Sequence, residues 1–449
     1  MEINSPLKSA HHAVLPELPE ELLLNVLSFV YERSTLRNLS ITSKLFHRLT
    51  APFLYRTLKF EMKAPPTPLE KFLRTIITRP ELAPCVRVIE IQRGWPWHSY
   101  SPSAHVGSAA VIQPIEELVR AGHSAGVSES SNNDFFKVAE QDTPGIREIS
   151  WAKMFLTHLP NLQSLYVHGI KWSCWLLLAE ILDSATLQGS IEYRPFSKLR
   201  DVSIQYFPRM YSLHQDTFFD SGSGLISYLL QLPSLRTLRL VGFRDTLFES
   251  GARWPKGQCD ADTFVLRGFD TSISTLNHLL LSFKSLRHLT LDFLVQPGPG
   301  FAALRESLQN HRHSLETLRI TFNEDTNLDA PEHRNSTVPV GSLKDFDKLC
   351  NISVTPGVLL PEVKSFNQFV DKLPPCLERL WVSSGHEALF PALHHLAQTC
   401  QEDFPKLREV EVPPGVWRRL GPNEKRANEG VEELFKKEGV RFIVSNTPG

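Results

Sequence analysis

The amino-acid sequence predicts an α/β protein in which three short N-terminal helices precede a solenoid of parallel strands and helices. Apolar residues near the N-terminus recur at helical spacing. A short apolar phrase then recurs along the rest of the chain, and helical stretches separate many of its copies. One strand and one helix per unit, stacked in parallel, build a solenoid.

The N-terminal segment 15–60 contains start and stop signals for the three helices. Pro19 suits the first position of a helix, and two glutamates follow it where the helix dipole favours acids. Ser34 and Ser43 are expected to cap the second and third helices, and Pro52 to end the third. The expected apolar stripe of the first helix is Leu22, Leu23, Val26, Leu27 and Val30.

This small module carries more apolar surface than its own core can hide. Leu24 and Phe29, for example, lie outside the main stripe of the first helix. The surplus must therefore be covered by the rest of the chain or by a partner. A plain three-helix cap on the solenoid is the alternative to a docking module.

Several residues of this segment stand in a recognisable order: Leu18-Pro19-Glu20-Glu21-Leu22-Leu23, Val26-Leu27, Ile41, Ser43-Lys44, Phe46 and the trailing run from Ala51 to Leu58. In this order they resemble an F-box. The resemblance implies docking on the Skp-type adaptor of a cullin–RING ubiquitin ligase. The adaptor contacts that it implies are Leu18, Pro19, Leu22, Leu23, Val26, Ile41 and Leu45. Many members have a Val-Cys pair where this chain has Ile41-Thr42.

The recurring phrase reads apolar-x-x-apolar-x-apolar, and its last two apolar residues alternate as in a half-buried strand. Copies begin at Val86, Leu162, Leu199, Leu235, Leu286, Leu315, Leu349, Leu377 and Leu407. Spacings between these anchors run from 28 to 51 residues, with 76 across the first gap. Helices are expected at 225–232, 272–283, 301–311, 366–373 and 388–399, with 423–438 and 440–444 closing the array. The phrase resembles leucine-rich repeats, although the Asn that usually follows each strand is missing.

The expected domain organisation is a flexible N-terminus over 1–14, an F-box over 15–60 and the solenoid over 61–449. Polar stretches bearing Gly, Pro or Ser predict insertions near 95–146, 244–269 and 324–340. Such loops either shape a binding surface along one edge of the solenoid or are tolerated surface insertions.

Composition argues against several classes of function. A net charge of −1 with scattered Lys and Arg gives no field that would attract nucleic acid. The chain has no run of about 18 apolar residues, so no membrane span is expected. Its polar N-terminus lacks the apolar core of a signal peptide. The six dispersed cysteines suit a reducing compartment, so the protein is expected in the cytoplasm, the nucleus or both.

Motifs for catalysis or metal binding do not stand out. His311 and His313 are close and His394-His395 are adjacent, but a zinc site needs two further ligands at set spacings. No nucleophile, base and oxyanion arrangement can be assembled from the sequence. We therefore expect a non-catalytic protein without a cofactor.

These observations predict a substrate receptor in which the F-box docks on the adaptor and the solenoid binds a protein substrate. The strand residues between the apolar anchors should form the inner, concave face. They are Tyr166, His168, Asp201, Gln205, Arg239, His288, Asp292, Arg319, Arg379 and Trp381. Tyr166, Arg239, Arg319, Arg379 and Trp381 are the candidate substrate contacts, because aromatic and Arg residues dominate interface hot spots. Trp381 is either open on this face or covered by a loop or by the C-terminal cap.

The sequence leaves two alternatives open. The chain could be an F-box scaffold that binds partners outside any ubiquitin ligase. It could also be an enzyme on an unfamiliar repeat frame, with polar residues that converge only in three dimensions.

Overall fold

The computed structural model describes most of the elements that the sequence predicts. The described residues are 18–62, 71–72, 75–76, 78–93, 159–170, 196–206, 222–243, 254, 256–269, 272–294, 301–322, 339–360, 368–383, 389–413 and 422–445. The expected flexible N-terminus at 1–14 and the expected insertion at 95–146 lie outside these residues. So does nearly all of the insertion expected at 324–340.

Three helices form the N-terminal module: α1 (Glu20–Ser28), α2 (Arg33–Thr42) and α3 (Lys44–Leu54). They enclose a small core of their own, made of Leu23, Leu27, Leu36, Phe46 and Leu49. This core is separate from the main core of the chain. The three-helix module predicted from the sequence is therefore confirmed.

The ends of these helices follow the sequence signals only in part. Ser43 caps α3, because its hydroxyl accepts a hydrogen bond from the Phe46 amide at 3.1 Å. Ser34 does not cap α2, because Glu32 occupies the N-cap position, without a side-chain capping bond, and Ser34 donates to the Glu32 carboxylate at 2.6 Å. Pro52 does not end α3, which runs on to Leu54. A proline so near the end removes one backbone hydrogen bond without breaking the last turn.

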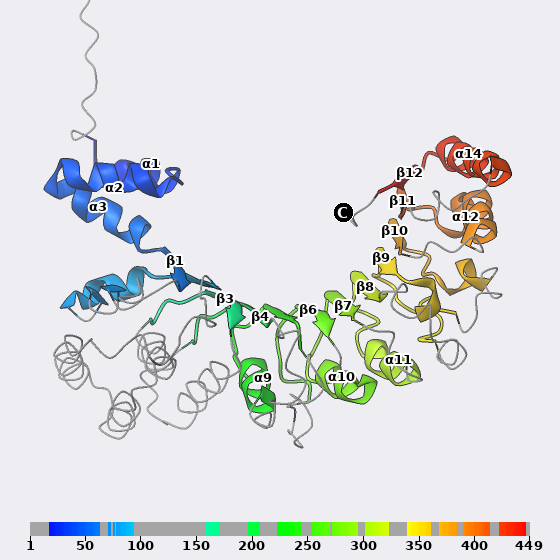
Figure 1. Cartoon of the computed structure of the whole chain (residues 1–449), viewed down its shortest axis with the longest axis horizontal. Coiled ribbons are helices and arrows are strands. Elements are labelled where there is room, and N and C mark those ends of the chain that lie inside the picture. The colour runs from blue at the N-terminus through cyan, green and yellow to red at the C-terminus, as the bar shows by residue number, and fades with distance from the viewer. Residues whose placement is uncertain are drawn as a thin grey trace, which may run out of the picture.

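Twelve parallel strands follow in one sheet, in the order of the sequence. They are β1 (Thr57–Met62), β2 (Val88–Arg93), β3 (Ser164–Ile170), β4 (Asp201–Tyr206), β5 (Thr237–Val241), β6 (Thr263–Phe269), β7 (His288–Phe293), β8 (Thr317–Phe322), β9 (Asn351–Val354), β10 (Arg379–Val382), β11 (Glu409–Val412) and β12 (Arg441–Val444). Figure 1 shows that the strands line the inside of an arc and that helices lie along its outside. The predicted α/β solenoid is confirmed.

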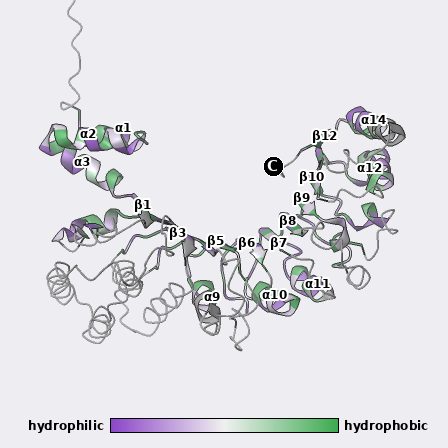
Figure 2. Cartoon of the chain, viewed as in Figure 1, coloured by the Kyte–Doolittle hydropathy of each residue, from purple (hydrophilic) through white to green (hydrophobic). Residues whose placement is uncertain are grey.

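The helices of the solenoid cover the outer face of this sheet (Figure 1). They are α9 (Gly222–Leu230), α10 (Ile273–Leu280), α11 (Phe301–Gln309), α12 (Leu389–Asp403) and α14 (Pro422–Lys437). Short 3-10 helices occur as η2 (Pro80–Cys85), η9 (Pro356–Val358) and η11 (Val370–Lys372). In Figure 2, helices such as α10 and α11 carry both hydrophobic and hydrophilic residues, as helices with one buried side do. The prediction of a helix at 366–373 is wrong in its described part. That part forms only the short 3-10 helix η11, which precedes Pro374 and Pro375.

The prediction of an insertion at 244–269 is wrong at its C-terminal end, where residues Thr263–Phe269 form strand β6. It lies between β5 and β7 and pairs with both in continuous register up to Arg267. Its anchors follow the same phrase, with Phe264 and Leu266 fully buried and Ala261 in place of the usual leucine. Because the first anchor is so small, the sequence pattern did not reveal this repeat.

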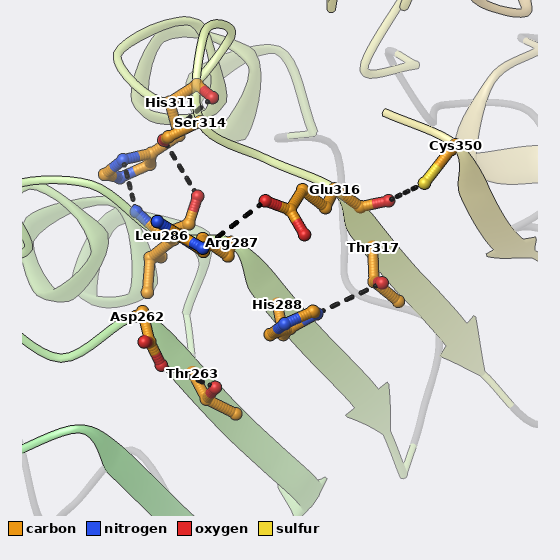
Figure 3. Close-up of polar contacts among 10 residues, drawn as sticks. All are labelled: Asp262, Thr263, Leu286, Arg287, His288, His311, Ser314, Glu316, Thr317 and Cys350. Atoms are coloured by element: carbon orange, nitrogen blue, oxygen red, sulfur yellow. Dashed lines mark hydrogen bonds and ion pairs between the residues drawn. The ribbon is translucent and has the colours of Figure 1, made fainter. Parts of the chain in front are cut away.

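Polar contacts join neighbouring repeats around the starts of the strands (Figure 3). The side chain of Ser314 donates to the Leu286 carbonyl at 2.8 Å, and Arg287 lies 3.8 Å from the carboxylate of Glu316. His288 and Thr317 meet through side-chain atoms 3.1 Å apart. The repeats therefore stack through side-chain hydrogen bonds as well as through the parallel ladder and the apolar core.

Candidate interaction surfaces

The N-terminal module exposes an unusual amount of apolar side chain. Leu22 and Val26 on α1 are each 49% exposed, and Ile41 on α2 is 79% exposed. Leu24, Phe29 and Tyr31 are exposed as well. Among the described residues, the other large exposed hydrophobic side chains are Leu294 and Val444. Such a concentration of exposed apolar side chains in one small module is typical of a site of interaction.

The adaptor contacts implied by the resemblance occupy different positions in this module. Leu22, Val26, Ile41 and Pro19 are exposed. Leu18 and Leu45 are half-buried and pack against the core of the module. Leu23 is only 1% exposed and lies inside that core. The structure thus turns Leu22 and Val26 outward, although helical spacing had grouped them in one stripe with Leu23 and Leu27.

The second surface is the concave face of the sheet. Along β5 the side chains of Leu238 and Leu240 are buried, while Arg239 between them is exposed. The strand register places equivalent residues side by side, and we call this line of residues the central row. It consists of Lys59, Glu90, Tyr166, Ser203, Arg239, Val265, Thr290, Arg319, Ser353, Trp381, Glu411 and Ile443.

Four of the five candidate substrate contacts fall in the central row, and Arg379 lies at the start of β10 in the adjacent row. The structure brings two of them together, because the Arg319 guanidinium carbon lies 5.5 Å from the centroid of the Trp381 ring. That is the geometry of a cation–π contact. Arg239 and Tyr166 lie farther along the row, on β5 and β3. Sequence reasoning missed Ser353, which lies between Arg319 and Trp381 in the register, although its place in the phrase matches theirs.

The positive charge of Arg319 is only partly balanced by its surroundings. Burial lowers the pKa of its guanidinium, and the positive charge of Arg267 lowers it further. The carboxylate of Asp292 opposes this effect, but one of its oxygens also accepts a hydrogen bond from Thr321 at 3.0 Å. Arg267 and Arg319 together bring two positive charges against the single negative charge of Asp292, so this group of three side chains is net positive.

Metal-binding clusters and membrane-spanning helices are not found in the described part of the chain. It contains no cluster of three or more His, Cys, Asp or Glu side chains placed to hold a metal ion. Within the same residues, no helix has the length and apolar character needed to span a membrane. His311, one of the histidines considered as a metal ligand, bonds to backbone groups of the preceding repeat instead.

The two parts of the chain match known domain families. Residues 15–61 match the F-box-like domain, and residues 275–416 match a leucine-rich repeat domain. The chain is thus a modular repeat protein with an F-box-like domain at its N-terminus, as its sequence motifs predicted. This domain arrangement is consistent with that of an F-box protein. It suggests a substrate adaptor in the context of ubiquitin ligases, and adaptors with this arrangement are typically non-catalytic. The F-box-like domain also implies binding to a Skp-type adaptor.

Comparison with solved structures gives a weaker likeness. One similar chain comes from a structure described as the crystal structure of the Rad7 and Elc1 complex in yeast. The two chains are 14% identical, and the match covers 88% of this chain and 87% of that chain with a TM-score of 0.28. A comparison with curated proteins gave no match.

Proposed function

We propose that this chain is the substrate-recognition subunit of a Skp–cullin–F-box type ubiquitin ligase. The N-terminal module docks on a Skp-type adaptor and reaches a cullin through it, while the solenoid holds a protein substrate. The chain itself contributes proximity rather than catalysis, since other subunits transfer the ubiquitin. It needs no cofactor and acts in the cytoplasm, the nucleus or both.

The exposed apolar side chains of α1 and α2 are the observation that carries this proposal. Burying one such side chain against a partner contributes roughly 1.5–3 kcal/mol when it was fully exposed before. Leu22 and Val26 start half-exposed, so each gains part of that amount. Leu18, Pro19, Ile41 and Leu45 extend the same proposed contact. Leu23 supports it from inside the module.

The test is co-purification of a Skp-type adaptor with a Leu22→Asp, Val26→Asp double variant. Two carboxylates at this interface would be buried without partners, so adaptor recovery should fall to background. Leu294→Asp is a matched control, because Leu294 is also a half-exposed leucine but belongs to the solenoid. Leu23 is avoided because a charge at that position would unfold the module. Full adaptor recovery by the double variant refutes the docking surface.

A second measurement separates a ligase subunit from a scaffold. The full chain is assembled with the adaptor, a cullin and the ubiquitin-conjugating components, and ubiquitin transfer to co-purifying proteins is followed. The proposal expects transfer that depends on Leu22 and Val26. Adaptor binding without any transfer would favour the scaffold.

A further inference from the structure

Three adjacent strands of the concave face present polar atoms that lack partners. Arg319 on β8, Ser353 on β9 and Trp381 on β10 are register neighbours in the central row. The Arg319 Nε, Ser353 Oγ and Trp381 Nε1 atoms are buried, and none has a hydrogen-bond partner among the described residues. Buried polar groups of native proteins are normally paired, so a cluster of unpaired ones calls for an explanation.

The chemistry of these atoms specifies what would complete the site. The Nε of Arg and the Nε1 of Trp can only donate, and a Ser hydroxyl can donate as well. Arg319 also brings a positive charge that burial and Arg267 already disfavour. The complementary group is therefore rich in acceptors and negatively charged. Arg319 and Trp381 are half-buried, so each keeps surface that a ligand can touch.

Two further arginines extend the basic surface toward the N-terminal side. Arg239 in the central row of β5 is exposed, and so is Arg267 on the neighbouring strand β6. Parallel strands lie about 4.8 Å apart, so the three steps from β5 to β8 cover about 14 Å. An extended peptide spans that distance in about four residues. On the other side, the buried Glu411 follows Trp381 in the row and ends the basic stretch.

We propose that the concave face from β5 to β10 binds an extended acidic segment of the protein substrate. The Asp or Glu carboxylates of this segment pair with Arg239, Arg267 and Arg319. The Trp381 ring positions the Arg319 guanidinium through their cation–π contact. This inference rests on the proposed function, because it names the kind of substrate that the solenoid would hold. The planar guanidinium fork matches a carboxylate through two parallel hydrogen bonds.

Fluorescence anisotropy tests the proposal with the full chain bound to its adaptor. The probe is a labelled peptide of about ten residues in which Glu alternates with Ser, long enough to cover the stretch from β5 to β8. Arg239→Ala with Arg267→Ala should raise the Kd about tenfold or more, which is the loss of one or two good contacts. Both side chains are exposed, so the variant should fold normally. Added salt should weaken wild-type binding as well.

Two more variants sharpen the result. Arg319→Lys keeps the charge but loses the planar fork, so the Kd should rise severalfold. Arg305→Ala is the matched control: this exposed arginine lies on α11, on the convex side of the arc, and its loss should leave the Kd unchanged (Figure 1).

The proposal is overturned if the wild-type chain does not bind the peptide, or if the double variant binds it equally well. It is also overturned if a single-stranded oligonucleotide of equal charge binds more tightly. Adaptor co-purification is read separately in each sample. Loss of the proposed function would appear there, whereas failure of the acidic-segment proposal would leave adaptor binding intact.

Discussion

His311 shows how a single side chain can join two repeats. It is 1% exposed, and its Nδ1 accepts a hydrogen bond from the Leu286 amide at 3.3 Å. That role leaves the proton on Nε2, which faces the Leu280 carbonyl at 3.3 Å. The bond from the Leu286 amide needs the neutral ring, and burial lowers the pKa of His311 from its ordinary value of 6.5, although the bond to the Leu280 carbonyl opposes that shift. The contact belongs to the folding of the solenoid rather than to metal binding.

Replacing His311 by Ala should destabilise the solenoid. The Leu286 amide and the Leu280 carbonyl would lose their buried partner, at about 1–3 kcal/mol for each group. Chemical denaturation of the variant measures this cost. His313 is the control, because its side chain is exposed and its pairing with Asp347 lies at the surface. If His313→Ala destabilises the chain as much as His311→Ala, the buried bridge is not the cause.

The same residue predicts how stability depends on pH. Below pH 6.5 the unfolded chain protonates His311 more readily than the folded chain does, because the folded pKa is lower. The free energy of unfolding should therefore fall as the pH drops from 6.5 toward the folded pKa. Above 6.5 this contribution is fully present. Denaturation curves at several pH values should show a smaller loss in His311→Ala than in the wild type, and an identical loss would exclude this origin.

At the scale of single elements, the two serines near the F-box helices allow a matched comparison. Ser43 accepts the Phe46 amide and caps α3, so Ser43→Ala should lower the stability of the module by about 1 kcal/mol. Ser34 bonds only to the side chain of Glu32, so Ser34→Ala should have little effect. Thermal unfolding of both variants checks the difference. Equal shifts in the two variants would contradict the capping assignment.

Predictions from the sequence succeeded where one pattern has one structural solution. The phrase apolar-x-x-apolar-x-apolar located the strands because alternation fits a half-buried strand and no helix. It failed at β6, where Ala261 takes the place of a leucine and still becomes fully buried. On α1, spacing grouped Leu22 with Leu23, but the structure exposes one and buries the other. Periodicity does not tell a face that meets its own core from a face left for a partner.

The candidate site, too, was predicted from the sequence only in part. Strand alternation placed Arg319 and Trp381 between buried anchors, and the structure has both half-buried between fully buried neighbours on their strands. Their mutual contact depends on side-chain conformation and on the exact register of three strands, neither of which the sequence states. The unpaired atoms of Arg319, Ser353 and Trp381 are visible only in three dimensions.

At the scale of the whole molecule, the two separate cores predict two responses to core damage. Leu266 on β6 is fully buried in the main core, and Leu266→Ala should cost about 2–5 kcal/mol there. Repeats touch mainly their neighbours, so hydrogen exchange should quicken first in β5, β6 and β7. Leu36→Ala, in the core of the N-terminal module, should instead quicken exchange in α1 to α3. A protease-resistant fragment limited to residues 190–330 would argue against a single solenoid.

The junction between α3 and β1 has a mechanical consequence. Only Tyr55 and Arg56 separate the two elements, and the ring centroids of Tyr55 and Phe72 lie 6.0 Å apart. Ala51 and Tyr55 also pack against the main core of the solenoid. The short connection and these contacts therefore fix the orientation of the N-terminal module relative to the first repeats of the solenoid. Under the proposed function, a substrate bound to the concave face keeps a fixed orientation relative to the subunits that transfer ubiquitin. That orientation decides which of the substrate's lysines can be modified.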